Sequence, residues 1–523
     1  LPDNNQECTM VRAALIDEHR LTYDLDTVGH DYIGVGKDTD IYSKLASMFG
    51  GKPTKNVQIL NLVRAPKELV SIYAKQDTRT TLKLWEWQEI EIAQQGLTKV
   101  TKLERDLLPV VVDMEFRGVR VNPQAAEAAV DNITKEVSIT QAKLNSIAGF
   151  EVNPNPSGSI IKLFEPKQNN KGIWILNDGT IAETTDGGKA SINSDVLRNM
   201  KHPAAELILS LRKMLKTRDT FLRGHILGHH YNGLIHANIN QTKGENERGT
   251  STGRLSYNSP ALQQIHKRDK AIAAIIRSIF IPDQDQEWAC CDLSQAEMRW
   301  FAHYAKDSRI IKQYHDDPDT DFYQTLSDMT GIPRNADGTG GANTKQLSLA
   351  AVFGMSDGRL VEEMGYQSEI EYGRNGKPYK KPGSEAQHML DKFNQSVPGI
   401  KSFLRGASAI AKDREYVISI AGRHLRFPRG QFTHKAGGLI LQSANADAIK
   451  SIMIAQHKLL KNTSSRMLLS VHDEIDLSVS KIDISNGIIG EIKKIMENLG
   501  GIQCRVPHRC DPVTSPNWWL SCM

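Results

Sequence analysis

The sequence lacks any apolar run of about 18 residues, the length at which a membrane-spanning helix becomes a candidate. It shows no signal or transit peptide, and because it begins at Leu1 rather than Met, we expect its natural start to lie upstream. Six cysteines in 523 residues are too few for a disulfide framework, so a reducing, cytoplasmic setting is expected. There is no repeat of fixed period and no long low-complexity tract. These absences exclude membrane-spanning, disulfide-rich secreted and repeat proteins.

The composition is that of an ordinary globular protein, with 39% hydrophobic and 24% charged residues. A chain of this length is too long for one compact core and predicts about two to four domains. Lysine and arginine number 65 and the acids 61, a net charge of +4. That total neither demands nor excludes a nucleic-acid partner, because a near-neutral sum can hide a basic groove opposite an acidic site.

Helices and strands are mixed without a β-α-β rhythm, which favours an α+β fold. The periodicity predicts helix through much of 1–98, 99–145 and 203–229, and loops with short elements over 150–195. It further predicts a buried strand over 286–293, helices over 294–306 and 342–353, an inserted loop over 366–384, and a β-hairpin over 466–479.

Two aspartates lie at the edges of apolar strands. Asp292 follows Trp-Ala-Cys-Cys, and Asp473 follows Leu-Leu-Ser-Val-His. An aspartate there is costly unless it is paired or coordinates a cation, and two such residues can hold two Mg²⁺ ions for phosphoryl transfer. Each alone is more typical of a turn or capping residue, so the pair gains weight only from its neighbours.

Those neighbours resemble the motifs of family A DNA polymerases, the bacterial polymerase I-like group. D-L-S-Q-A-E-M-R at 292–299 resembles motif A, and H-D-E at 472–474 resembles motif C. T-S-T-G-R-L-S-Y-N-S-P-A-L-Q-Q-I at 250–265, Q-S-A-N-A-D-A-I-K at 442–450 and the late P-N-W-W also match, in the family's order. The resemblance covers about residues 100–523 and is too specific for chance.

The resemblance implies a right-hand polymerase fold of palm, fingers and thumb, with a partial RNase H-like exonuclease domain in front. The expected divisions are 1–98 for a partial, inactive 3′–5′ exonuclease-like domain, 99–235 for the thumb and the start of the polymerase domain, 236–305 for the first part of the palm, 306–430 for the fingers, and 431–523 for the second part of the palm.

It also implies roles for residues around the two aspartates. Asp292 and Asp473 would bind two Mg²⁺ ions, with Mn²⁺ as a substitute, and the Leu293 carbonyl would assist. Glu474 would be a nearby, less essential carboxylate, and His472 would contact the primer terminus. Glu297 stands where a fixed side chain under the sugar clashes with a ribose 2′-hydroxyl.

The helix expected at 342–353 carries Lys345, Leu349 and Phe353 four residues apart, hence on one face. There a lysine can hold a triphosphate, an apolar side chain can pack on the deoxyribose, and an aromatic ring can cover the nascent base pair. Spacing alone equally describes an amphipathic core stripe. The run K-Q-L-S-L-A-A-V-F-G, however, resembles the family's motif B, and it follows motif A by about fifty residues.

Further contacts follow from the resemblance. Arg254 and Gln442 would meet the minor groove, where every base pair offers acceptors. Lys216 and Arg218 lie in a basic helix that could be a plain solvated face, but beside the motifs they read as contacts to duplex phosphates. The remaining expected contacts are Arg277 near the triphosphate, and Gln295 and Arg299, which position DNA and support the site.

The sequence departs from the family pattern at three places. Leu349 replaces a phenylalanine or tyrosine, which should change discrimination against dideoxynucleotides. Gly341 stands where motif B has an arginine, with Arg334 as a candidate replacement, and His434 stands where the family has another arginine.

Y-A-K-Q-D at 73–77 resembles the third motif of the family's proofreading exonuclease, and Tyr23–Asp26 supports a relic of that domain. No D-x-E precedes them, so the acid set is incomplete and we expect no proofreading activity. Cys504, His508 and Cys510 lack zinc spacing. Residues 371–381 read as a solvated insertion, and a contact with single-stranded template by stacking and charge is the alternative.

The expected function is template-directed DNA synthesis on a primer 3′-hydroxyl, in replication or repair, by a monomer acting on primer-template DNA and dNTPs. No membrane partner is expected, and a processivity factor cannot be read from the sequence. One alternative is a single-subunit RNA polymerase or reverse transcriptase, which Glu297 and T-G-R-L-S oppose. Another is a silent primer-template binding protein, which would not need Asp292, Asp473 and Lys345.

Overall fold

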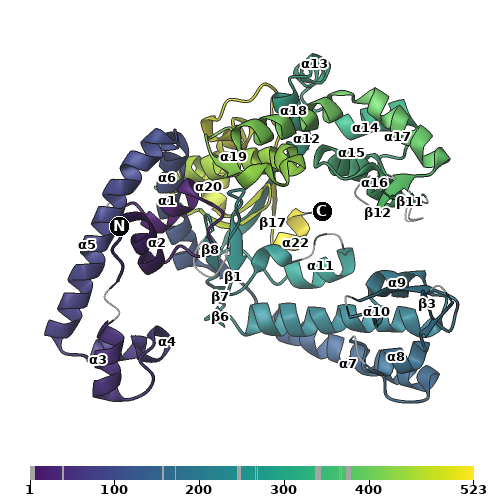
Figure 1. Cartoon of the computed structure of the whole chain (residues 1–523), viewed down its shortest axis with the longest axis horizontal. Coiled ribbons are helices and arrows are strands. Elements are labelled where there is room, and N and C mark those ends of the chain that lie inside the picture. Colours follow the sequence, from purple (N-terminus) through teal and green to yellow (C-terminus); the bar gives the residue numbers. More distant parts are fainter. Residues whose placement is uncertain are drawn as a thin grey trace. The chain divides into compact units, whose positions relative to one another are not determined.

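The computed structural model describes residues 6–37, 40–155, 158–170, 172–185, 187–243, 249–265, 267, 269–335, 343–363, 366, 368–372 and 378–522. The chain divides into two compact units, each made of three separate stretches. Figure 1 labels many of the helices and strands named below. The first unit comprises Leu1–Phe116, Ile239–Tyr257 and Ala289–Val513, and the second comprises Arg117–Asn238, Asn258–Trp288 and Thr514–Met523. None of the described helices is long and apolar enough to cross a membrane.

The first stretch of the first unit is helical, as the periodicity predicted. Its elements are α1 (Thr9–Ile16), α2 (Leu25–Ile33), α3 (Asp40–Phe49), α4 (Lys55–Gln58), η1 (Ile59–Arg64), α5 (Lys67–Gln94) and α6 (Thr98–Arg117). Leu15, Ile92 and Val100 share a core with Ala421, which anchors this stretch to the rest of its unit. No strand occurs among the described residues of 1–98. The exonuclease-like assignment of this region stays a prediction.

A four-stranded sheet carries the two aspartates. Its strands are β10 (Gln286–Asp292), β15 (Arg466–Val471), β16 (Glu474–Ser480) and β17 (Val513–Ser515), in the order β15-β16-β10-β17. β15 and β16 form the predicted antiparallel hairpin, with Val471 opposite Glu474. The predicted strand ending near Asp292 is also confirmed. Both hairpin strands are fully buried, which is why their residues read as an apolar pattern.

Helices make up most of the rest of the first unit. They are α12 (Ala296–Ala305), α13 (Ser308–Asp316), α14 (Phe322–Thr330), α15 (Thr344–Val352), α16 (Asp357–Glu363), α17 (Ser384–Ser396), α18 (Gly399–Arg414), α19 (Ala436–Leu460), α20 (Lys481–Ser485) and α21 (Ile488–Glu497), with η5 (Pro428–Gly430), η6 (Thr433–Lys435) and η7 (Leu499–Gly501). β8 (Asn238–Asn240) pairs with β9 (Ser256–Asn258), and β13 (Tyr416–Ile418) pairs with β14 (His424–Arg426). The helices predicted over 294–306 and 342–353 are confirmed by α12 and α15.

The prediction of a plain loop over 366–384 is wrong. β11 (Ser368–Tyr372) and β12 (Pro378–Pro382) pair antiparallel in this stretch. Tyr379 donates a hydrogen bond to Glu371 across the pair, and Lys381 forms an ion pair with the same carboxylate at 2.8 Å. Cross-strand pairs of this kind stabilise short ribbons. The glycines and prolines concealed them, since those residues dominate any reading of a short polar segment.

The second unit contains a long helical pair and a small sheet. Its elements are β1 (Val119–Arg120), α7 (Pro123–Ala148), α8 (Gly158–Phe164), β2 (Lys167–Gln168), β3 (Trp174–Ile175), β4 (Ile181–Thr184), β5 (Ala190–Ser191), α9 (Ser194–Asn199), α10 (Pro203–Leu215), η2 (Lys216–Leu227), β6 (His230–Tyr231), β7 (Leu234–Ile235), η4 (Leu262–Gln264), α11 (Lys270–Arg277) and α22 (Trp518–Ser521). A core including Leu144, Phe164 and Ile208 joins α7, α8 and α10. The predicted helix over 203–229 is confirmed, although its second half, η2, is a π-helix.

Candidate active site

The structure brings Asp292 and Asp473 together at one edge of the sheet. Asp292 is the last residue of β10, and Asp473 is the second residue of the two-residue turn that joins β15 to β16. The Leu293 amide donates a hydrogen bond to the Asp473 carbonyl at 3.3 Å. β10 lies beside β16 in the sheet, so both aspartates project from neighbouring strand ends.

The turn itself is tight. His472 has φ +62°, in the left-handed region that a non-glycine residue seldom adopts outside such turns. Its side chain is exposed, whereas Val471 and Glu474 on either side of the turn are buried. The turn therefore presents an imidazole to solvent immediately beside the aspartate pair.

Negative charge is concentrated at this edge. Burial raises the pKa of Asp473 well above its ordinary value, and the nearby Asp292, Glu297 and Glu474 carboxylates raise it further. Glu297 lies in the first turn of α12, directly after the Asp292 strand. Carboxylate oxygens are the ligands that Mg²⁺ prefers, and a divalent cation would offset this repulsion. The residues present therefore fit a divalent-metal site.

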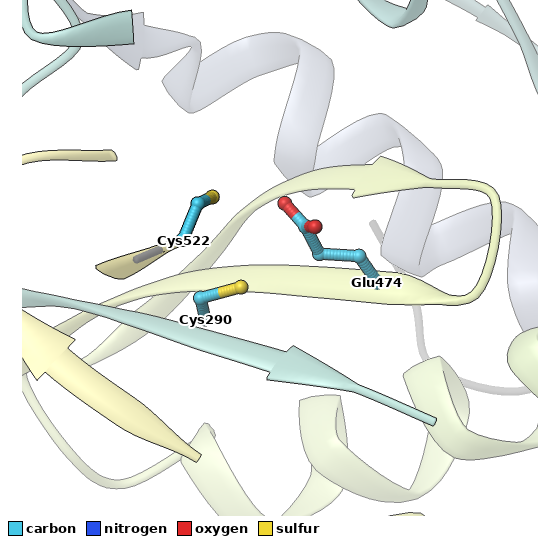
Figure 2. A group of neighbouring side chains, drawn as sticks. All are labelled: Cys290, Glu474 and Cys522. Carbon is cyan, nitrogen blue, oxygen red and sulfur yellow. The ribbon is translucent and has the colours of Figure 1, made fainter. Parts of the chain in front are cut away.

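Glu474 lies deeper than the aspartates, as the first residue of β16, and it is 3% exposed. Figure 2 shows its carboxylate and the Cys290 thiol on neighbouring strands, and their ligand atoms lie within 4.8 Å of one another. Cys290 and Asp292 are two apart on β10 and share a face of the strand. Glu474 is thus a buried neighbour on the Asp292 face of the sheet. Figure 2 also labels Cys522, which belongs to the other compact unit.

Lys345 and Leu349 lie one turn apart on α15, and Phe353 is the residue directly after the helix. Lys345 is exposed, and Leu349 and Phe353 are half-buried, while Leu347, Ser348 and Val352 on the opposite face are buried. The alternative of an apolar core stripe through Lys345, Leu349 and Phe353 is therefore wrong. Phe353 follows the helix and packs against Gly438 of α19, where a Cβ would meet the ring at 3.2 Å.

Tyr323 is a residue of this neighbourhood that sequence reasoning missed. It is 2% exposed, and the Lys345 ammonium lies 6.0 Å from its ring centroid. Burial raises the pKa of its hydroxyl, with further contributions from Glu297 and Asp473. The sequence offers one indication of its position, which is that Asp321 caps the start of α14 and accepts a hydrogen bond from the Tyr323 amide.

Gln295 and Arg299 tie the start of α12 to the segment before α14. Gln295 donates to the Thr320 carbonyl at 3.0 Å and accepts from the Phe322 amide at 3.1 Å. Arg299 is 1% exposed and donates to the carbonyls of Ser294, Pro318 and Pro507. Its donors are used internally, so this geometry gives no support to direct DNA contact by Arg299 and is that of a positioning residue.

Three further expected residues lie in the second unit. Arg277 is 1% exposed, donates to Cys522 Sγ at 3.0 Å and stacks over the Trp518 ring at 4.0 Å, so its geometry gives no support to a triphosphate contact. Lys216 is exposed. Arg218 pairs with Asp219 at 2.8 and 2.9 Å, which compensates its charge.

Arg254 and Gln442 are both half-buried. Among 440–450, all of which are described, only Gln442 is not buried. Of the residues at the sequence's departures, His434 is exposed and Arg334 pairs with Asp321. Gly341 lies outside the described residues.

Comparison with known proteins agrees with this site. The family model described as DNA polymerase family A matches residues 124–519. The chain belongs to DNA polymerase family A. It is 48% identical to the "DNA polymerase DpoZ" of Acinetobacter phage SH-Ab 15497, over 99% of this chain and 85% of the relative, and 46% identical to that of Salmonella phage PMBT28, over 98% and 84%.

The thermostable DNA polymerase I of Thermus aquaticus is a more distant relative of this family A chain, 28% identical over 79% of it and 47% of the relative. The polymerase domain of Pol1 from M. smegmatis, solved in complex with DNA primer-template and dNTP, shares the fold at a TM-score of 0.77 and 19% identity, covering 98% of this chain and 82% of that one. The right-hand polymerase fold is thereby confirmed. The protein is a DNA-directed DNA polymerase of phage type that carries out template-directed DNA synthesis.

Proposed function

We propose that Asp292 and Asp473, with the Leu293 carbonyl, hold two Mg²⁺ ions for nucleotidyl transfer in DNA replication. The observation that carries this is the carboxylate concentration that raises the pKa of Asp473 beside Asp292 and Glu297. When bound, the ions supply activation of the primer 3′-hydroxyl and neutralisation of the leaving pyrophosphate. Glu474, buried next to Asp292, supports the charge of the site without facing the substrate.

The incoming dNTP is held by the outer face of α15. Lys345 supplies a mobile cation for the triphosphate and a proton for the leaving pyrophosphate, Leu349 packs on the deoxyribose, and Phe353 covers the base pair. Glu297 closes the space that a ribose 2′-hydroxyl would need. The exposure of Lys345 beside half-buried Leu349 and Phe353 supports this division of roles.

Primer-template DNA is the macromolecular partner, bound by a monomer. Arg254 and Gln442 donate to minor-groove acceptors, His472 contacts the primer terminus, and Lys216 and Arg218 contact duplex phosphates. In this proposal residues 236–305 and 431–523 form the palm, 306–430 the fingers and 99–235 the thumb.

The test is extension of a labelled primer on a DNA template with Mg²⁺, using dNTPs or NTPs. We expect the parent to extend with dNTPs and Asp473→Asn and Asp292→Asn to lose about a hundredfold or more of the rate, because each removes one metal-binding charge. Asp316→Asn, at an exposed helix end, is the matched control and should extend like the parent.

DNA binding, measured by fluorescence anisotropy, should survive both site substitutions. Extension by Asp473→Asn at the parental rate would refute the metal assignment. Loss of extension together with loss of DNA binding and a lowered melting temperature would mean that the substitution disturbs the fold, and Asp292→Asn would then decide.

A further inference from the structure

A buried cluster of four charged side chains lies in the first unit. Glu104 comes from α6, Arg423 directly precedes β14, and Asp447 and Lys450 come from α19. Each of these side chains is at most 4% exposed. Arg423 donates to Asp447 Oδ1 from Nε at 3.1 Å and from Nη2 at 2.8 Å. Arg423 and Lys450 also both donate to Glu104 Oε1.

The cluster holds Gln241, the residue that directly follows β8. Gln241 donates from Nε2 to the Glu104 carbonyl at 3.0 Å and to Glu104 Oε2 at 3.1 Å. Lys450 donates to the Gln241 carbonyl at 2.7 Å. The buried charges therefore fix the position of Gln241.

The same cluster contacts Gly253, three residues before β9. A Cβ on Gly253 would lie 2.5 Å from Arg423 Nε and 2.6 Å from Cζ, so the Arg423 guanidinium lies directly against the glycine. Gly253 has φ +82°, a conformation that L side chains rarely adopt. Both the contact and the backbone conformation require glycine here.

The residue after Gly253 is Arg254. Its carbonyl accepts a hydrogen bond from Thr250 Oγ1 at 2.7 Å, which closes the turn. Its Nε is buried and has no hydrogen-bond partner among the described residues. The backbone of Arg254 is thus held at Gly253 and at its own carbonyl, and its Nε donor is not used by any described residue.

We propose that Arg423, oriented by Glu104 and Asp447, is a positioning residue that sets the Gly253 turn and thereby aims the Arg254 side chain at the primer-template. Buried ion pairs contribute little net stability but can fix one geometry, which suits this role. The planar fork of arginine is needed, because a lysine cannot hold Asp447 through two nitrogens and still cover Gly253. The inference rests on the proposed contact of Arg254 with DNA.

A double-mutant cycle tests the inference. The variants are Gly253→Ala, Arg254→Ala and the two combined, and the measurement is the dissociation constant for a primer-template duplex by anisotropy. We expect each single variant to bind about tenfold more weakly, and the double variant to bind no more weakly than Arg254→Ala, because both changes remove the same contact.

Gly487→Ala is the matched control. Gly487 has φ +85°, and nothing lies within 4 Å of its Cβ position, so this variant has the same backbone strain without the contact. It should bind DNA like the parent.

If Gly253→Ala and Arg254→Ala weaken binding additively, the glycine acts independently of Arg254 and the positioning role is overturned. If Arg254→Ala binds like the parent, the proposed DNA contact fails and the inference fails with it. If Gly253→Ala does not fold, Arg423→Lys replaces it in the cycle. Parental DNA binding by a folded Arg423→Lys would overturn the proposal. The proposal is supported if Arg423→Lys weakens DNA binding in the parent but causes no further weakening when combined with Arg254→Ala.

Discussion

On α15, a single side chain, Leu349, stands between the cation and the aromatic ring that face the proposed nucleotide site. It is half-buried and aliphatic, where the family pattern has an aromatic residue. Its branched end offers less contact area and no hydroxyl, so its packing against the sugar must differ from that of a ring. A change at this position should act on the sugar and leave base recognition unaltered.

Leu349→Tyr should therefore change the ratio of dideoxynucleotide to deoxynucleotide incorporation, because a phenol places a polar group where the 3′-hydroxyl is read. We expect a change of about tenfold or more in the ratio of the two kcat/KM values, measured by single-nucleotide extension. Gln346→Ala, on the exposed surface of the same helix, is the control and should leave the ratio unchanged. An unchanged ratio for Leu349→Tyr would remove this residue from sugar recognition.

Individual residues were predicted unevenly from the sequence. The proximity of Asp292 and Asp473 and the exposure of Lys345 agree with what the motif resemblance implied, while the roles assigned to these residues stay predictions. Arg277 and Arg299 were assigned to ligands, yet both are buried and their donors face groups of the protein. A charged residue inside a motif reads the same whether its donors face a ligand or a carbonyl, so only packing distinguishes the two.

At the scale of elements, the chain following η7 packs across α12, and this contact buries His508 of the chain and His303 of the helix. His508 is 2% exposed, its ring lies 5.2 Å from that of Trp300, and neither ring nitrogen has a hydrogen-bond partner among the described residues. Burial lowers the pKa of His508 to about 3, with help from Arg299 and His303. Burial likewise lowers the pKa of His303 to about 4, with help from Arg505. Both are therefore held neutral where α12 is covered.

The sign of the pH dependence follows. An unfolded histidine binds a proton near pH 6.5, whereas these folded ones do not, so stability is full above pH 6.5 and is lost as pH falls toward 3 to 4. The loss should be about 1.4 kcal/mol per pH unit for each histidine. We expect the urea midpoint of the first unit to fall between about pH 7 and about pH 5, and to fall less in His508→Phe. His388→Phe, at an exposed site, should keep the parental slope, and an equal slope in His508→Phe would contradict this account.

Elements were predicted best where a buried segment contains a clear pattern of apolar residues. The hairpin of β15 and β16 is buried throughout, and its apolar alternation was legible. The pairing of β11 with β12 was missed because it depends on the Glu371, Tyr379 and Lys381 contacts between strands, and no single strand contains that signal. The π-helical form of η2 was also not predicted, because the apolar pattern of 203–229 indicates a helix without showing whether its hydrogen bonds span four residues or five.

At the scale of the whole molecule, the net charge of +4 says little about DNA binding. What matters is which cations are already compensated inside the protein. Lys216 is exposed, whereas Arg218 is paired with Asp219 in two hydrogen bonds. The sequence does not distinguish these two cations of one helix, but they should contribute unequally to phosphate binding.

Lys216→Ala should reduce the slope of log K for duplex DNA against log salt by about 1, since one released counterion is lost. Arg218→Ala should reduce it by less, because the Arg218 charge is already compensated by Asp219 within the protein. Lys312→Ala is the control and should keep the slope, because Lys312 lies on α13, away from η2 in the sequence, and pairs there with Asp316. An unchanged slope in Lys216→Ala would exclude it from phosphate contact.

The motifs could not reveal how the chain is partitioned, because they are contiguous and the units are not. The first unit takes residues from the beginning, the middle and the late part of the sequence, and its last stretch ends at Val513. On a ribosome, its α6, its loop with Arg254 and its β10 would emerge long before the hairpin that completes the sheet. The Glu104 carboxylate would remain without its partners Arg423 and Lys450 until some three hundred further residues had been synthesised. Nascent chains of this enzyme should therefore spend most of their synthesis as clients of chaperones, and a stalled chain should be cleared by proteases rather than persist as a half-built polymerase.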